Sequence, residues 1–401
     1  MGAVKKKSHT MPQSLAEAQA RHAKRLKKVE QALANFEKQR HKLATLEAQL
    51  AMLVHKDIDA AAATNAHHHP QPAPLERAYV IVNPKSKCLV DGTIQLQTIV
   101  DELQAVGILA EIGLKASGKV ARLLARAAVE RGDPLLIVAA GDGTIEDVAP
   151  ELIGSHTALG ILPLGTMNNL ARSLGIPLDL RAACQLLAMR ATRHLDIGRV
   201  ITPDHSHKVY FLETAGVGLS AIAAPLGQDV EKGRWSSLVD SLGKFFAFEA
   251  AHVTITLDKG HVLHAETNLI LLANAPLFGN HMLAAPNAKM DDGLLDLAVY
   301  AGMSKIDLES YFLSISDGRR VDEPRVQFHQ VHKLRITADA ALEAHADLDV
   351  FAQQQTWEFE VLPHALSVVV GNGLALTVPV RAAPPPPPLA GPQLVVEGKP
   401  A

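Results

Sequence analysis

The sequence contains few cysteines and few aromatic residues, and both shortages narrow the class of protein. Its two cysteines among 401 residues, Cys88 and Cys184, are far apart and belong to no CxxC pair. This spacing argues against a disulfide framework or a thiolate metal site, and it fits a reducing compartment. Aromatic residues make up only 4% of the chain, so its core must be built mainly from Leu, Val, Ile and Ala.

The sequence also lacks a long apolar run. A bilayer-spanning helix needs roughly 18 or more apolar residues, and the best candidate segment, 366–380, is interrupted by Gly371, Asn372 and Gly373. The lysines at 5–7 precede no apolar segment, so no secretory signal peptide is predicted. We therefore expect a cytoplasmic protein, and we expect any activity on a lipid to take place at the inner face of the membrane.

Positive charge is concentrated at the beginning of the chain, although the net charge is only −3. Residues 1–56 carry twelve Lys and Arg and four Glu, a net charge of +8, which leaves −11 for the rest. Leu26, Val29, Leu33 and Phe36 have the 3-4-3 spacing of a coiled coil, and later leucines repeat it. Residues 1–60 are therefore predicted to form a basic coiled-coil helix, which either joins copies of the chain or packs on its body.

Composition divides the remainder into a linker, two domains and a tail. Residues 61–76 form a linker rich in Ala, His and Pro, and 381–401 form a proline-rich tail that we expect to be disordered. Residues 77–197 alternate apolar strands with helical segments, which predicts an α/β domain with a largely parallel sheet. Residues 198–380 contain short β-rich runs separated by turn residues, which predicts an antiparallel β-sandwich.

The strongest signal for chemistry is a glycine turn after the apolar strand at 134–139. Gly141-Asp142-Gly143-Thr144 stands between that strand and a helix predicted from residue 145. Glycines let a backbone approach phosphate groups closely, and the N–H groups at a helix N-terminus bind anions. Asp142 is then a carboxylate placed to hold a magnesium-bound phosphate, although Asp-Gly turns are common in proteins of any function.

A second glycine turn follows the next strand, predicted at 158–162. Gly165 and Thr166 turn the chain, and Asn168 and Asn169 are placed to cap a helix at 170–174. Because open α/β sheets bind ligands at the carboxyl ends of their strands, we expect both glycine turns at the same edge of the sheet. A weaker signal at that edge is the turn after the first strand, formed by Asn83, Pro84 and Ser86.

Taken together, these three segments resemble the phosphate-side motifs of the diacylglycerol kinase catalytic-domain family, which includes bacterial lipid kinases and sphingosine kinases. A block at 274–297 is similar to a further segment of that family. The resemblance covers roughly residues 77–380 and implies an α/β nucleotide domain, a β-sandwich lipid-substrate domain and an active site between them. It further implies an ATP- and Mg²⁺-dependent kinase that phosphorylates a hydroxyl of diacylglycerol or a related lipid alcohol.

The resemblance also assigns residues to the site. The metal ligands it implies are the side chain of Asp292 and the carbonyl groups of Lys289 and Leu294, an oxygen-only set that suits Mg²⁺. The general base it implies is Asp349, with Asp347 as the fallback and Asp142 as a further candidate. The nucleotide-binding residues it implies are Asn83, Pro84, Ser86, Gly141, Asp142, Gly143, Thr144, Gly165, Thr166, Asn168 and Asn169.

The chain departs from the family pattern at several positions. Leu348 and Asp349 stand where the family has the Gly and Glu of an Asp-Gly-Glu turn. Two alternatives therefore remain open: a weak or inactive relative that acts as a nucleotide-binding regulatory or assembly module, and an NAD kinase-like enzyme, whose family shares the first glycine turn. The other replaced positions are Ala140, Glu146, Asp147, Lys87, Asn280 and His281.

One further segment, 113–120, nearly forms a Walker A loop. Val120 stands where that loop has a magnesium-binding hydroxyl, so we reject a Walker A site. Lys115 and Lys119 remain candidates for contacts with phosphates. The partners we expect are a lipid alcohol substrate, a membrane surface in transient contact, and a second copy of the chain through the N-terminal helix, with no nucleic acid.

Overall fold

A computed structural model describes residues 76–201, 208–223, 247–278, 282–283, 285–316 and 323–370. The chain divides into two compact units, 1–71 and 72–401, and all described residues belong to the second. The predicted coiled-coil helix at 1–60, the linker up to residue 75 and the tail at 381–401 lie outside the described residues, as do positions 280 and 281. None of the helices in the described part has both the length and the apolar character of a bilayer-spanning segment.

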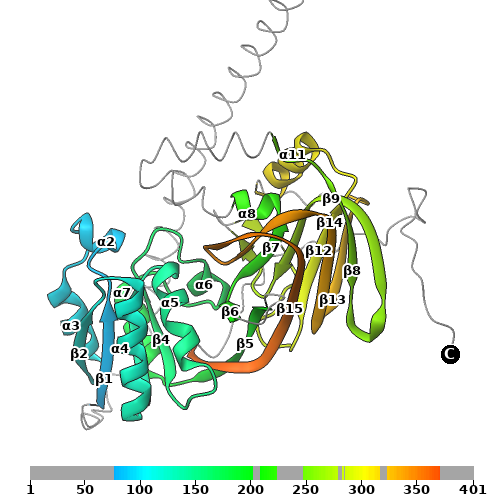
Figure 1. Cartoon of the computed structure of the whole chain (residues 1–401). Helices are drawn as coiled ribbons and strands as arrows, with labels where there is room; N and C mark the ends of the chain where they lie inside the picture. The colour runs from blue at the N-terminus through cyan, green and yellow to red at the C-terminus, as the bar shows by residue number, and fades with distance from the viewer. Residues whose placement is uncertain are drawn as a thin grey trace, which may run out of the picture. The chain divides into compact units, whose positions relative to one another are not determined.

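The first half of the described fold is an α/β arrangement. Its parallel strands are β1 (Glu76–Val82), β2 (Ile108–Leu114), β3 (Leu135–Ala140) and β4 (Ala158–Pro163). They lie in the order β2-β1-β3-β4 (Figure 1). The helices are α2 (Lys87–Val90), α3 (Leu96–Ala105), α4 (Gly118–Arg131), α5 (Asp142–Leu152), α6 (Asn169–Ser173) and α7 (Leu180–Ala188).

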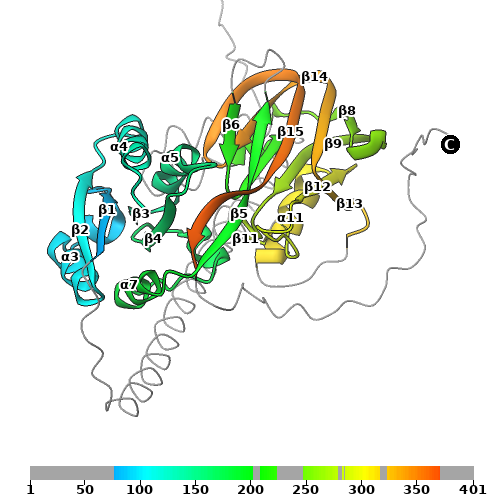
Figure 2. The same ribbon diagram turned by 90° about the horizontal axis from the view of Figure 1, so that it is seen from below.

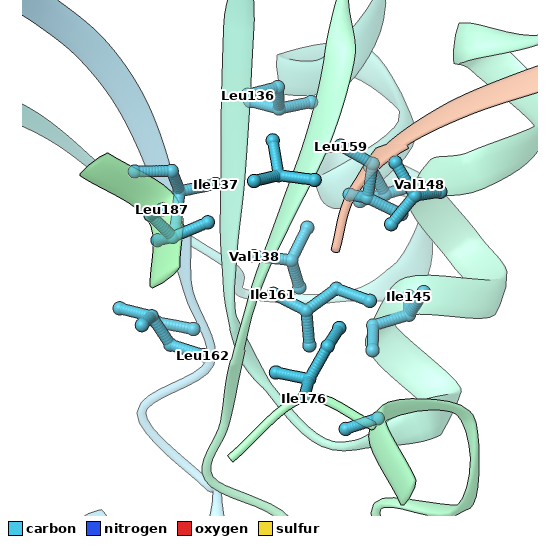
Figure 3. Close-up of a cluster of buried hydrophobic side chains, with 14 of the residues drawn as sticks. Leu136, Ile137, Val138, Ile145, Val148, Leu159, Ile161, Leu162, Ile176 and Leu187 are labelled. Carbon is cyan, nitrogen blue, oxygen red and sulfur yellow. The ribbon is translucent and has the colours of Figure 1, made fainter. Parts of the chain in front are cut away.

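The central strands β3 and β4 are buried along their whole length, because helices cover both faces of the sheet. In Figure 3, Leu187 of α7 lies on one side of these strands, while Ile145 and Val148 of α5 lie on the other. Continuous apolar runs such as 135–140 predict this kind of buried parallel strand, and the prediction of an α/β half is confirmed.

The second half of the fold is built from antiparallel strands around a separate core, which includes the buried side chains of Phe211, Trp357 and Phe359. The predicted antiparallel architecture is therefore confirmed. Its first elements are β5 (Thr192–Ile201), β6 (Lys208–Phe211), β7 (Thr214–Gly218), α8 (Leu219–Ala223), β8 (Ala251–Thr256) and η1 (Asp258–Gly260). The remaining elements are β9 (Val262–Ala273), β10 (Leu277–Phe278), β11 (Met282–Leu283), β12 (Leu295–Ala301), α11 (Lys305–Ser316), β13 (Val326–Val331), β14 (Lys333–Ala346) and β15 (Asp349–Val369).

The long strand β15 connects the two halves. Its first part pairs with β14, and its later part pairs with β5 and, at Val368, with β4 (Figure 2). Leu366, Val368 and Val369 are accordingly buried in the first core rather than in the second. Part of the segment predicted as the second domain, 198–380, thus belongs to the first core, and β15 links the two cores directly.

Candidate active site

The two glycine turns meet at the carboxyl ends of β3 and β4, as the sequence predicts. Ala140 and Pro163 are paired at the ends of these strands. A Cβ atom added to Gly165 would lie 2.4 Å from the Cα of Gly141, and one added to Gly141 would lie 2.9 Å from the Cα of Gly165. The two backbones therefore approach so closely that only glycine fits at either position.

A cavity of about 890 Å³ opens at this edge of the sheet. One wall comes from the first half, with Asn83, Ser86 and the two glycine turns. The opposite wall comes from the second half, with Glu213 and the β14–β15 hairpin at 346–349. All of the predicted nucleotide-binding and catalytic residues line the cavity except Pro84 and Asn168.

The side chain of Asn168 forms hydrogen bonds with the second glycine turn rather than with the helix that follows it. Its side-chain oxygen accepts from the backbone N–H of Gly165 at 2.9 Å, and its amide donates to the carbonyl of Gly165 at 2.9 Å. Asn168 has a left-handed backbone, with φ of 51°, which turns its side chain back toward Gly165. Asn168 stands at the N-cap position of α6, as predicted, but its side chain accepts no hydrogen bond from the helix.

Asp142 supplies the cap that Asn168 does not. Its carboxylate accepts from the backbone N–H groups of Asn169 at 3.1 Å and Leu170 at 3.3 Å, at the start of α6. Burial raises the pKa of Asp142, and these hydrogen bonds act in the opposite direction. Because both of its oxygens accept backbone N–H groups, Asp142 joins the two glycine turns to each other.

The two aspartates of the β14–β15 hairpin have different environments. Asp347 is buried, and its carboxylate accepts from the backbone N–H groups of Leu212, Glu213 and Thr214 at 2.7, 2.9 and 3.0 Å. Burial raises the pKa of Asp347 to about 6, although these hydrogen bonds favour its charged form. Asp349 is exposed and lines the cavity. Asp349 is therefore open to the cavity, whereas the hydrogen bonds of Asp347 hold the hairpin in place.

Two further carboxylates, Glu146 and Glu213, line the same cavity. Burial raises the pKa of both well above the usual value for glutamate, and the nearby carboxylates of Asp142 and Asp347 raise it further. The sequence marks Glu146 only as a departure from the family pattern, and it gives no signal for Glu213. Glu213 lies in the bend between β6 and β7, and it becomes a site residue only through the pairing that places β7 beside β14.

These buried carboxyl groups predict that the stability of the protein depends on pH. A carboxyl group whose pKa is raised by folding stabilises the protein below its unfolded pKa, and that contribution is lost as the pH rises through the folded pKa. We therefore expect the thermal midpoint of the ligand-free chain to fall as the pH rises from about 5 to 8. Glu213→Gln should weaken this fall and raise the midpoint at the upper pH, whereas Glu309→Gln, on the exposed face of α11, should leave it unchanged. Equal pH dependence of wild type and Glu213→Gln in calorimetry would contradict the assignment.

Positively charged side chains also line the cavity. The lysine at the end of β2, Lys115, lines it, whereas Lys119 is exposed and does not. The segment 113–120, which resembles a Walker A loop, therefore contributes one lysine to the cavity lining. This lysine follows the end of a strand and does not belong to a phosphate-binding loop. The other cationic residues that line the cavity are Lys85, Lys87 and Arg122.

Comparison with known proteins agrees with this arrangement. The family model described as the diacylglycerol kinase catalytic domain matches residues 77–200, and the YegS C-terminal NAD kinase beta sandwich-like domain matches 214–370. A YegS-like lipid kinase from Pseudomonas fluorescens is 31% identical over 209 residues, which cover 51% of this chain and 68% of that protein.

The chain belongs to the diacylglycerol kinase catalytic-domain family. This is a family of lipid kinases. A diacylglycerol kinase from Mycobacterium tuberculosis is 28% identical over 252 residues, covering 62% of this chain and 81% of that protein. A crystal structure of a diacylglycerol kinase from Bacillus anthracis has the same fold, with a TM-score of 0.58, 21% identity, and coverage of 74% of this chain and 97% of that chain.

The metal loop implied by membership of this kinase family lies before β12, away from the cavity lining. The carboxylate of Asp292 is exposed and accepts from the backbone N–H of Leu294 at 3.1 Å. Nearby, Asp296 is buried, and its Oδ2 atom accepts no hydrogen bond from the described residues. Burial and, to a lesser extent, the nearby carboxylate of Asp292 raise the pKa of Asp296 to about 6.

A buried, unpaired carboxylate oxygen beside a second carboxylate fits a hard cation, so the residues present suit the implied metal. In the described residues, no three His, Cys, Asp or Glu side chains are grouped closely enough to hold an ion. A site in this loop would therefore use backbone oxygens as well as carboxylates, in keeping with the ligand set that the family resemblance implies.

Proposed function

We propose that this kinase transfers the γ-phosphate of ATP, in the presence of Mg²⁺, to a hydroxyl of diacylglycerol or a related lipid alcohol. The observation that carries the proposal is the contact between Gly141 and Gly165 on one wall of a cavity whose other wall presents Asp349. Two glycine turns at neighbouring strand ends suit a triphosphate. The name of the relative from M. tuberculosis, a diacylglycerol kinase, supports diacylglycerol as the acceptor.

The residues of the cavity divide the work of phosphoryl transfer between its two walls. The backbone N–H groups of Gly143 and Thr166, in the two glycine turns, bind the phosphates, while the Thr144 and Ser86 hydroxyls supply further contacts. Ser86 Oγ is buried and has no hydrogen-bond partner among the described residues, so it is available to a ligand. Positioning of this kind provides most of the catalysis in phosphoryl transfer.

Asp349 accepts the proton of the lipid hydroxyl while the oxygen of that hydroxyl forms a bond to the γ-phosphorus of ATP. The bond between that phosphorus and the β–γ bridging oxygen breaks, and ADP leaves. Mg²⁺ bound with ATP would neutralise charge on the phosphates. In the loop before β12, Asp292 and the carbonyl groups of Lys289 and Leu294 would hold a Mg²⁺ ion. An acceptor with acyl chains resides in a membrane, so we also propose transient contact of the chain with the membrane surface, as a peripheral cytoplasmic enzyme.

The test is a transfer assay with γ-labelled ATP, the full chain, and vesicles that contain diacylglycerol, a sphingoid base or ceramide, with soluble NAD in a parallel reaction. We expect Mg²⁺-dependent label in the lipid fraction, abolished by EDTA and restored by excess Mg²⁺. Label on NAD alone would identify an NAD kinase instead. ATP binding without transfer to any acceptor would identify an inactive regulatory module, and either result would overturn the proposal.

A further inference from the structure

Lys115 occupies an unusual position beside the first glycine turn. Its ammonium lies 3.0 Å from the Thr144 hydroxyl, 2.8 Å from the Asp147 carboxylate and 3.5 Å from the Gly143 carbonyl. The side chain is 13% exposed and lines the cavity. Three contacts in the first turns of α5 therefore fix the ammonium against the segment proposed to bind phosphates.

Electrostatics makes this position costly unless an anion is present. The N-terminus of a helix such as α5 carries a partial positive charge, so a cation at this end is repelled by the helix dipole. Asp147 offsets part of this repulsion, but Arg122 shares the same carboxylate at 3.2 Å. Lys115 and Arg122 thus place two positive charges around the single carboxylate of Asp147, so this cluster would attract an anionic ligand beside Lys115.

The approach of Asp147 to Lys115 depends on a glycine. Gly118 is the first residue of α4, and a Cβ atom added there would lie 2.5 Å from the Asp147 Oδ1 atom. Any other residue at 118 would push the Asp147 carboxylate away. The sequence thus combines Lys115, Gly118 and Asp147 in one arrangement, in which Asp147 fixes the lysine and the lysine faces the cavity.

We infer that Lys115 is a specificity-determining residue of this kinase, whose ammonium binds the phosphate chain of the nucleotide, and that Asp147 is the residue that positions it. This inference rests on the proposed function, because it takes the nucleotide to bind at the turn 141–144. An ammonium has three N–H donors. Two are used by Thr144 and Asp147, and the third has only the long contact with the Gly143 carbonyl, so it is available to a phosphate oxygen.

The experiment is calorimetric titration of the full chain with Mg²⁺-ATP, ADP, AMP and adenosine. We expect Lys115→Met to weaken ATP binding about 10- to 100-fold, as the loss of a charge-assisted hydrogen bond implies. Binding of adenosine should change little, because it has no phosphate. Lys119→Met is the matched control, since Lys119 is exposed and lies outside the cavity, and it should bind ATP like the wild type.

Asp147→Asn tests the positioning role. This variant keeps the lysine but removes the negative charge that holds it, so ATP affinity should fall less than in Lys115→Met. The dependence of ATP affinity on salt concentration should remain as in the wild type. In Lys115→Met, by contrast, that salt dependence should weaken. If Lys115→Met lowers the thermal midpoint strongly, Lys115→Gln, which retains an N–H donor for Thr144 and Asp147, replaces it.

The outcomes separate the two proposals. Wild-type ATP affinity in Lys115→Met and Lys115→Gln, with the wild type itself binding ATP, overturns the inference and leaves the proposed function standing. Absence of ATP binding by the wild type overturns the proposed function and the inference with it. Equal losses of ATP and adenosine binding would show a merely structural role and would also overturn the inference.

Discussion

Asp349→Asn is expected to lower kcat for lipid phosphorylation about 10²- to 10⁴-fold, the usual contribution of a general base. The amide cannot accept the proton of the attacking hydroxyl. Because Asp349 is exposed at the start of β15, the folded state should lose little stability, and ATP affinity should remain close to that of the wild type. Initial rates at saturating ATP and lipid, together with a thermal melt, check both parts of the prediction.

Asp347→Asn is the matched comparison for Asp349→Asn. The same substitution two residues away should lower the stability of the folded protein rather than remove the general base. An asparagine amide would oppose one of the three backbone N–H groups that now donate to the Asp347 carboxylate. Loss of such hydrogen bonds costs about 1–3 kcal/mol each when a buried group is left unpaired. Should Asp347→Asn stop turnover without affecting the melt while Asp349→Asn stays active, the two roles are reversed.

Gly165→Ala is expected to abolish tight nucleotide binding. The added Cβ would lie 2.4 Å from the Gly141 Cα, a backbone atom that cannot rotate away, so the two glycine turns must separate. Overpacking of this kind costs about 1–3 kcal/mol of folding free energy. We expect at least a tenfold loss of ATP affinity in addition, since both phosphate-binding turns move. Titration with ATP and chemical unfolding measure the two effects.

Gly143→Ala provides the stability control from the same turn. Its added Cβ would meet only the Leu348 Cδ1 atom, at 3.4 Å, an ordinary contact with a flexible side chain. It should therefore unfold at nearly the wild-type denaturant concentration. Wild-type ATP affinity in Gly165→Ala would show that the contact between the two turns is unimportant for the nucleotide.

The sequence predicts the α/β half of this kinase well because its strands are short apolar runs. β3 and β4 are found within one residue, since a fully buried parallel strand has no polar positions to obscure it. The start of α5 is missed by three residues, because Gly141-Asp142-Gly143 has the composition of a turn although Asp142 already lies in the helix.

Elements with mixed composition are not predicted. β5 combines charged residues such as Arg193, Asp196 and Arg199 with apolar ones, and α11 has an apolar face that is poorly separated from its polar face. The return of β15 to the first core is also beyond local patterns, because it depends on pairing with β5, more than 150 residues away in the chain.

The candidate site shows the same limit. Glycine turns and the hairpin carboxylates can be placed from motif and strand order, and they do line one cavity. The role of Asp142 as a cap for α6 and the presence of Glu213 cannot be predicted in this way, because each depends on contacts between segments that are distant in sequence. The hydrogen bonds between Asn168 and Gly165 are local, but they depend on the left-handed backbone of Asn168, which the motif does not indicate. Sequence motifs therefore indicate which residues line the cavity, whereas the fold determines which hydrogen bonds each of them makes.

The most direct test of the central claim is a crystal structure of the full chain with Mg²⁺ and a non-hydrolysable ATP analogue. The account predicts a triphosphate against the backbone N–H groups of Gly143 and Thr166, with its terminal phosphate facing the side of the cavity that presents Asp349. A nucleotide bound elsewhere, with the cavity filled by protein side chains instead, would contradict it.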